Sequence, residues 1–201
     1  AVYTFAFSIV FKMRWAGASE STAAFALLLF LGLSTFTFFS DTVNRAPTQI
    51  LENAAYVKKV VFPLEVLPWV TVLVNGFTFL VSFLIFACFY PFVFGLPPLT
   101  ILWLPVVLAP LLFLTLGLAW ALASMGVFLR DIRPSVTVLT TALMFLSPIF
   151  YPLEAVPEKI RQIIALNPMA AVLENLRAVV FWGHQPALDW LVLQYALSFV
   201  I

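Results

Sequence analysis

The sequence predicts an all-α integral membrane protein, with residues 1–201 forming a single transmembrane domain. The first observation is composition: 64% of the 201 residues are hydrophobic, 9% are charged, and the mean hydropathy is +1.10. Soluble domains carry about 25% charged and about 45–50% apolar residues, so the solvent of this chain must be lipid. The second observation is that the apolar runs are continuous. Continuous runs favour helices over a membrane β-barrel, whose strands alternate apolar and polar residues.

The first elements along the chain are one partial and one complete membrane helix. Residues 1–11 are uncharged but shorter than the ~20 residues that a crossing helix needs. We interpret them as the tail of a first span that begins upstream. The uncharged run between Glu20 and Asp41 is long enough for one complete span.

Two further spans are expected in the uncharged run 66–129, which is too long for a single crossing. Turn-forming residues at 95–100 (GLPPLT) place a hairpin between them. Residues 134–153 predict another complete span, and the run that begins at Trp190 opens a helix that the chain does not complete. The expectation is therefore four complete and two truncated spans, which implies six in the intact protein.

The polar segment 41–65 predicts an amphipathic helix on the membrane surface. Pro47 can open this helix, because the first helical turn does not need the N–H that proline lacks. Pro63 would end it. Its apolar stripe is expected to consist of Ile50, Leu51, Ala54, Val57, Val60 and Val61.

A second polar segment, 154–188, predicts a pair of short helices. The first would start at Pro157. The second would start at Pro168 with Asn167 as its cap, and would end near Trp182. At 1.5 Å per residue both are shorter than the ~30 Å hydrocarbon core, so we expect them to dip into one leaflet or to lie on it.

The lysines and arginines do not assign an orientation in the membrane. If 41–65 and the short charged turn 130–133 lie on one side, the ten basic residues divide equally between the two sides.

The chain contains no residue pattern for catalysis or nucleotide hydrolysis. It has no GxxxxGK[ST] phosphate-binding loop, and its single histidine, His184, and single cysteine, Cys88, lack metal-ligand spacing. The expected spans carry no charge within their apolar runs, which argues against an ion-coupled transporter. We therefore expect neither an enzyme nor a cofactor or metal on this chain. A net charge of +1 gives no reason to expect a nucleic-acid partner.

The aromatic side chains leave two interpretations open. The 22 Phe, 6 Trp and 5 Tyr include a cluster of Phe145, Phe150 and Tyr151. Such residues could bind sugar rings or a lipid chain along a transport path, or they could be core and interface residues.

The polar segments together resemble those of a known family. The matching stretches are, in order, 56–68 (YVKKVVFPLEVLP), 128–133 (FLRDIR), 147–152 (SPIFYP), 156–157 (VP) and 166–169 (LNPM). Their order and spacing resemble the permease subunit of ATP-binding cassette exporters of bacterial cell-surface polysaccharides, which export O-antigen, capsule or teichoic acid. The resemblance extends over nearly the whole chain and does not specify the sugar.

The resemblance implies a homodimer of six-span subunits in the bacterial cytoplasmic (inner) membrane, with both termini in the cytoplasm. ATP and Mg²⁺ would bind to two copies of a separate ATPase subunit, and the permease would move a lipid-linked polysaccharide, as in O-antigen export during lipopolysaccharide biosynthesis. Segments 41–65 and 130–133 would then face the cytoplasm, and the amphipathic stretch would be the coupling helix that rests in a groove of the ATPase.

Three groups of site residues follow from the resemblance. The ATPase-coupling residues would be Tyr56, Val57, Lys58, Lys59, Phe62, Pro63 and Glu65. The cytoplasmic turn would contribute Arg130, Asp131 and Arg133. The outer gate and channel mouth would contain Phe150, Tyr151, Pro152, Asn167 and Pro168.

Three alternative functions remain compatible with the sequence. An exporter of the same architecture could carry a drug or a small lipid. A membrane-embedded glycan ligase or acyltransferase would need a catalytic cavity, for which His184 and scattered acidic residues are the candidates. A channel that works without an ATPase is the third.

Overall fold

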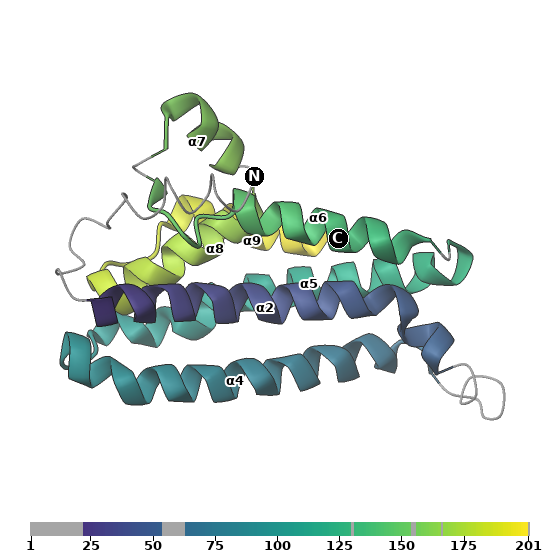
Figure 1. Cartoon of the computed structure of the whole chain (residues 1–201), viewed down its shortest axis with the longest axis horizontal. Coiled ribbons are helices and arrows are strands. Elements are labelled where there is room, and N and C mark those ends of the chain that lie inside the picture. Colours follow the sequence, from purple (N-terminus) through teal and green to yellow (C-terminus); the bar gives the residue numbers. More distant parts are fainter. Residues whose placement is uncertain (1–21, 54–62, 130, 154–155, 166, 201) are drawn as a thin grey trace.

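The computed structural model describes residues 22–53, 63–129, 131–153, 156–165 and 167–200 (Figure 1). All the elements in these ranges are helices, which confirms the predicted all-α class. They are α2 (Thr22–Glu52), α4 (Val66–Phe94), the 3-10 helix η1 (Leu99–Trp103), α5 (Leu104–Phe128), α6 (Ile132–Leu146), α7 (Glu158–Ala165), α8 (Pro168–Arg177), the π-helix η3 (Ala178–Trp182) and α9 (Leu188–Val200).

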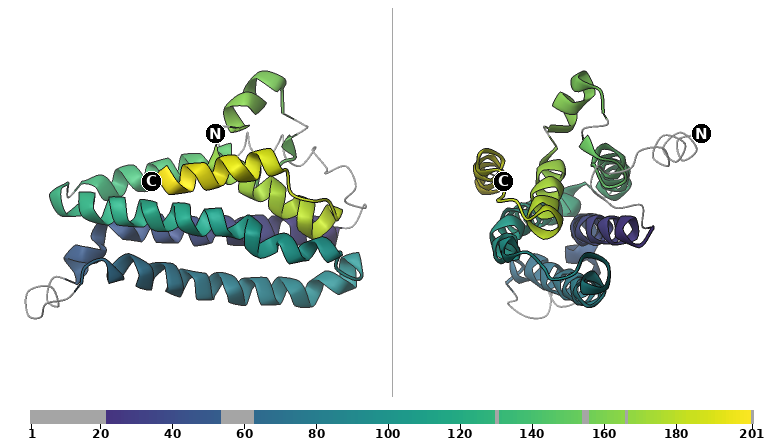
Figure 2. Two further views of the ribbon diagram at one scale, coloured as in Figure 1. Left: turned by 180° about the vertical axis from the view of Figure 1, so that it is seen from behind. Right: turned by 90° about the vertical axis from the view of Figure 1, so that its left-hand side faces the viewer.

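Helix α2 is the centre of the bundle. It packs against α4, α5, α6 and α8, and α9 covers α5 and α8 on the other side. The long helices α2, α4 and α5 run side by side along the longest axis of the molecule (Figures 1 and 2). Helix α7 stands apart from the bundle in both figures and contacts it through α8.

Among the described residues, three helices are long and apolar enough to cross a bilayer: Ala23–Glu52, Val66–Phe94 and Leu99–Phe128. The hairpin expected at 95–100 is confirmed, since α4 ends at Phe94 and the chain reverses through Gly95. Gly95 has φ 78°, a conformation that favours glycine. Large apolar side chains such as Leu73 and Phe77 point outward from α4, as lipid contacts require. The chain is a multi-pass membrane protein.

The predicted end of the first complete span at Asp41 is wrong. Helix α2 continues as one helix through Asp41 and Pro47 to Glu52, so no separate helix opens at Pro47. The continuation is held by packing, because Val43 and Ala46 are buried. Pro47 is tolerated inside the helix, as prolines often are in membrane helices whose neighbours compensate for the lost hydrogen bond.

This extension has two further consequences for the sequence-based expectations. The helix that carries the span continues past the uncharged run 21–40 and contains Asp41 and Arg45, both exposed. At ~1.5 Å per residue its 31 residues exceed the ~30 Å core, so the extra turns leave the hydrocarbon region. The rest of the expected amphipathic stripe, beyond residue 53, lies outside the described residues.

The predicted span 134–153 is also too long. Helix α6 has 15 residues and ends at Leu146. The residue before a proline is disfavoured in the α conformation. Ser147, which precedes Pro148, has ψ 141°, and it ends the helix. A helix of this length measures ~22 Å and does not by itself cross the core.

The short helical pair is confirmed as α7 and α8, but its two members differ in environment. Helix α8 extends through η3 to Trp182, and Gly183 ends it with φ 65°. Eight of the ten residues of α8 are buried. It is therefore part of the bundle rather than a surface helix.

Small residues let α5 approach α2 closely near one end of the bundle. The buried small face of α5 consists of Ala119, Ala123 and Gly126, whereas Ala121 and Ser124 are exposed. A Cβ atom added to Gly126 would lie 2.0 Å from the carbonyl oxygen of Pro47. The position therefore requires glycine.

We predict that Gly126→Ala destabilises the protein, because the backbones of α2 and α5 would have to separate. Overpacking of this kind typically costs about 1–3 kcal/mol. Thermal unfolding of the purified protein in detergent measures the loss. Gly76→Ala is the matched control, since its Cβ would meet only the Phe38 side chain at 3.8 Å. Equal melting temperatures for the two variants would contradict the prediction.

Candidate functional site

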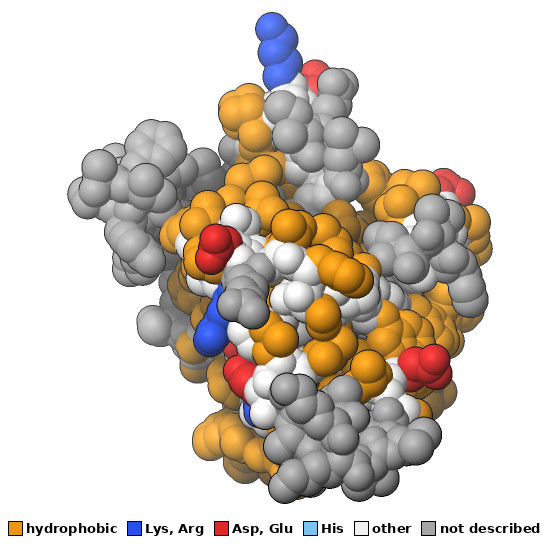
Figure 3. All heavy atoms as spheres, turned by 90° about the vertical axis from the view of Figure 1, so that its right-hand side faces the viewer, with side chains coloured by type: hydrophobic (Ala, Val, Ile, Leu, Met, Phe, Trp, Pro, Cys, Tyr) orange, Lys and Arg blue, Asp and Glu red, His pale blue; other side chains and the backbone are white. Residues whose placement is uncertain are grey.

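One end of the bundle gathers the segments that the sequence predicts for ATPase coupling. The end of α2, the start of α4, the end of α5 and the start of α6 meet there (Figure 1). Figure 3 views the molecule from this side and shows acidic and basic side chains among the apolar ones.

Of the predicted coupling residues, the structure describes Pro63 and Glu65; Tyr56, Val57, Lys58, Lys59 and Phe62 lie outside the described residues. Pro63 and Glu65 are exposed and directly precede α4. The Pro63 carbonyl accepts a hydrogen bond from the Val66 N–H at 3.2 Å. The Glu65 carbonyl accepts one from the Trp120 indole on α5 at 3.1 Å. The chain entering α4 is therefore attached to α5.

The end of α2, which lies on the other side of residues 54–62, is also attached to a neighbouring helix. Gln49 is buried, and its side-chain oxygen accepts a hydrogen bond from the Thr71 hydroxyl on α4 at 2.8 Å. The side chain of Asn53 donates to the Gln49 carbonyl at 2.7 Å. A small cavity of about 180 Å³ lies here, lined in part by Arg45 and Glu52. The chain on both sides of residues 54–62 is therefore hydrogen-bonded to a neighbouring long helix.

The predicted cytoplasmic turn lies at the same end. Asp131 and Arg133 are exposed, and Arg130 lies outside the described residues. Asp131 occupies the cap position of α6 without a side-chain cap hydrogen bond. Its carboxylate and the Arg133 guanidinium are therefore presented outward at the same end as Glu65.

Polar side chains connect α2 to its neighbours inside the bundle. Asn75 of α4 donates to the Thr42 hydroxyl at 2.9 Å. Thr140 of α6 donates to the Asn44 side chain at 3.1 Å. Such interhelical hydrogen bonds stabilise membrane bundles by about 1 kcal/mol each, and here they couple α2 to both α4 and α6.

The predicted outer residues Asn167 and Pro168 join the end of α6 to the start of α8. Asn167 is buried; its oxygen accepts from the Met169 N–H at 2.9 Å, which confirms it as the helix cap. Its amide nitrogen donates to the Ser147 hydroxyl at 2.9 Å. The Pro168 carbonyl accepts from Gln194 of α9 at 3.3 Å.

The other predicted outer residues are partly or fully buried in the connection after α6. Phe150 packs against the main hydrophobic cluster and Pro152 is buried. The Tyr151 hydroxyl donates to the Phe145 carbonyl at 3.3 Å. Burial raises the pKa of the Tyr151 hydroxyl above its ordinary value.

Arg177 is an important residue whose burial the sequence reasoning missed. Its side chain is only 3% exposed, although it is charged and lies among largely apolar residues. Its Nη2 donates to the Ile149 carbonyl at 3.1 Å, and its Nη1 forms an ion pair with Glu174 at 3.2 Å. Gly32 of α2 leaves room for the guanidinium. The signal in the sequence was the apolar surroundings of this arginine, AAVLENLRAVV.

We predict that Arg177→Ala destabilises the protein, because the buried Ile149 carbonyl would lose its donor. An unsatisfied buried acceptor costs about 1–3 kcal/mol. The thermal midpoint in detergent should fall by several degrees. Lys159→Ala, which removes an exposed basic residue of α7, should leave it unchanged. An unchanged thermal midpoint for Arg177→Ala would contradict the prediction that this hydrogen bond stabilises the protein.

Comparisons with known proteins give the family. The sequence profile described as ABC-2 type transporter matches residues 1–181. The chain is 26% identical over 202 residues to an O-antigen export system permease protein RfbA of Klebsiella pneumoniae, covering 100% of this chain and 74% of that protein. It is 27% identical over 202 residues to the protein of the same name from Myxococcus xanthus, covering 100% and 75%. The bundle of apolar helices fits a permease, and the chain belongs to the ABC-2 type transporter family.

Proposed function

We propose that the chain is the membrane-spanning subunit of an ATP-driven exporter that moves a lipid-linked polysaccharide across the bacterial cytoplasmic membrane. A separate ATPase subunit supplies the ATP hydrolysis, and a second copy of the chain completes a homodimer with six spans per subunit. The observation that carries the proposal is the similarity of the whole chain to O-antigen export permeases, combined with the position of the end of α2, the start of α4 and the 131–133 turn at one end of the bundle.

The contacts at that end explain how an ATPase could drive the bundle. The segment between Glu52 and Pro63 connects α2 to α4, and both helices run the length of the molecule. A displacement of this segment would therefore move both helices. The Gly126–Pro47 contact carries that motion to α5, because backbones this close cannot slide independently.

The same displacement can reach the opposite end. The Asn44–Thr140 hydrogen bond connects α2 to α6, and the Ser147–Asn167 hydrogen bond connects the end of α6 to α8. An ATP-driven movement of α2 would thus shift the α7–α8 pair, to which we assign the outer gate.

We place the polysaccharide conduit between two copies of the chain. The interior of one bundle is filled by a hydrophobic cluster that includes Phe36, Phe39 and Leu111. A glycan could not enter this interior or the lipid, since each hydroxyl transferred without a hydrogen-bond partner costs about 2–7 kcal/mol. A polar route must therefore open outside the core of a single chain.

The orientation can be tested by cysteine accessibility in a Cys88→Ser background. Glu65→Cys and Asp131→Cys should react with a membrane-impermeant maleimide only after the cytoplasmic membrane is permeabilised. Gln185→Cys, an exposed position at the opposite end, should react in spheroplasts that remain intact. Labelling of Glu65→Cys from outside would overturn the proposed orientation and with it the ATPase contact.

The ATPase contact can be tested by charge reversal at Lys58 and Lys59. Like charges placed opposite one another at an interface cost several kcal/mol, so Lys58→Glu with Lys59→Glu should reduce both ATPase co-purification and polysaccharide export, by about tenfold or more. Lys159→Glu on α7 is the control for ATPase co-purification, which it should leave unchanged. Export by the wild-type permease without any ATPase would refute the proposed function.

A further inference from the structure

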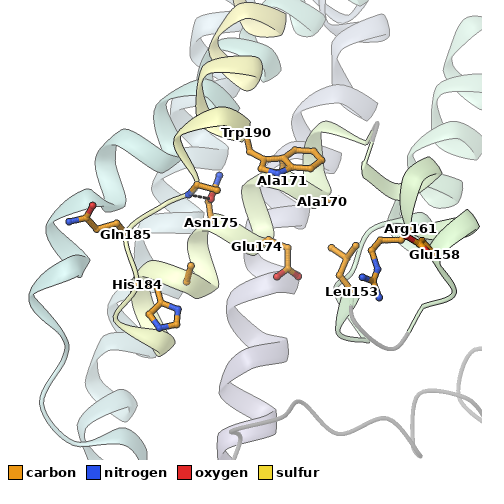
Figure 4. Close-up of a pocket in the computed structure, with 12 residues that line it drawn as sticks. Leu153, Glu158, Arg161, Ala170, Ala171, Glu174, Asn175, His184, Gln185 and Trp190 are labelled. Atoms are coloured by element: carbon orange, nitrogen blue, oxygen red, sulfur yellow. Dashed lines mark hydrogen bonds between the residues drawn. The ribbon is translucent and has the colours of Figure 1, made fainter.

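A cavity whose wall combines apolar and polar side chains lies beside the α7–α8 pair. Its volume is about 570 Å³, within the range of about 300–1,000 Å³ that is typical for small-molecule sites. Residues of α7, of α8 and of the connection into α9 line it (Figure 4). This connection follows η3, which packs on η1, so the cavity lies at the opposite end of the bundle from Glu65.

The side chains around the cavity combine one aromatic ring with several hydrogen-bonding groups. The indole of Trp190 is 38% exposed and forms part of the wall. The hydrogen-bonding groups are Glu158, Arg161, Glu174, Asn175, His184 and Gln185. An apolar ring face beside amides and carboxylates fits a ligand that has both an apolar face and many hydroxyl groups.

The charges around the cavity favour a neutral ligand. Glu174 is paired with Arg177 at 3.2 Å. The wall itself carries two carboxylates, Glu158 and Glu174, against the single guanidinium of Arg161. Glu174 is offset by Arg177 and Glu158 by Arg161, so the wall has no net positive charge to attract an anionic phosphate, and it suits an uncharged, hydroxyl-rich molecule.

Asn175 adds a second and independent indication of a ligand. The residue is 4% exposed and lies in the cavity wall. Its side-chain oxygen accepts from the Ala187 N–H at 3.0 Å, which fixes the orientation of the amide. Its Nδ2 is buried and has no hydrogen-bond partner within the part of the chain that the structure describes. Buried donors are rarely left unsatisfied, so a hydroxyl acceptor is expected here.

We propose that this cavity is a binding subsite for a neutral saccharide unit, with a sugar ring stacked on Trp190 and a hydroxyl accepting from Asn175 Nδ2. Glu174 and Gln185 supply acceptors and donors for further hydroxyl groups. The inference rests on the proposed function, because it gives the exported polysaccharide a point of contact at the end of the bundle away from the ATPase.

The test measures binding of methyl glycosides of glucose, galactose, mannose and rhamnose to the purified permease–ATPase complex by saturation-transfer NMR. At least one glycoside should bind, and Trp190→Ala should weaken it about tenfold, while Trp190→Phe retains most of the affinity through its ring. Trp103→Ala is the matched control, because Trp103 is 37% exposed and is not part of the cavity wall. It should bind like the wild type.

The proposal is overturned if no glycoside binds, or if Trp190→Ala and Trp103→Ala behave alike. It is also overturned if glycerol 3-phosphate displaces the glycoside, since the site would then recognise a lipid headgroup. Polysaccharide export by the wild-type complex is measured in parallel. Export without glycoside binding removes the subsite and leaves the proposed function intact, whereas binding without export removes the proposed function and the subsite's role in it.

Discussion

The close contact between α2 and α5 at Pro47 and Gly126 determines the positions of the other elements. Because no side chain separates the two backbones, α2 and α5 cannot shift past one another along their axes at this point. The starts of α4 and α6 are then held at the same end by the Trp120–Glu65 hydrogen bond and by the short connection after α5. A surface for a partner protein can form here because four helix ends are kept together.

Polar groups are few in this bundle, and many of those in its interior join two helices. In lipid there is no hydrophobic force to bring helices together, so close packing and hydrogen bonds provide the specificity. Thr140 and Asn167 link α6 to α2 and α8 in this way. Arg177 ties α8 to the connection after α6 through the Ile149 carbonyl. The result is a continuous route of contacts between the two ends of the molecule.

The two ends differ in the chemistry that they offer. At one end, charged and exposed groups such as Asp131 and Arg133 suit a soluble protein partner. At the other, the cavity beside Trp190 and Asn175 suits a neutral ligand with hydroxyl groups. The two ends fit the proposed permease, in which a cytoplasmic ATPase drives the passage of a glycan. Neither end requires a catalytic group on this chain.

Composition and uncharged runs alone determined that the chain is a helical membrane protein and that a hairpin lies at Gly95, because apolar length and turn chemistry are local properties. The cap at Asn167 and the stop at Gly183 were predictable for the same reason. The stop of α6 before Pro148 is local as well, because the residue before a proline is disfavoured in the α conformation. The end of α2 and the burial of Arg177 could not be predicted in this way. Asp41 and Pro47 resemble helix boundaries locally, but the packing of Val43 and Ala46 on neighbouring helices outweighs them. Only the tertiary structure, through contacts between residues distant in sequence, decided where α2 ends and which polar side chains meet.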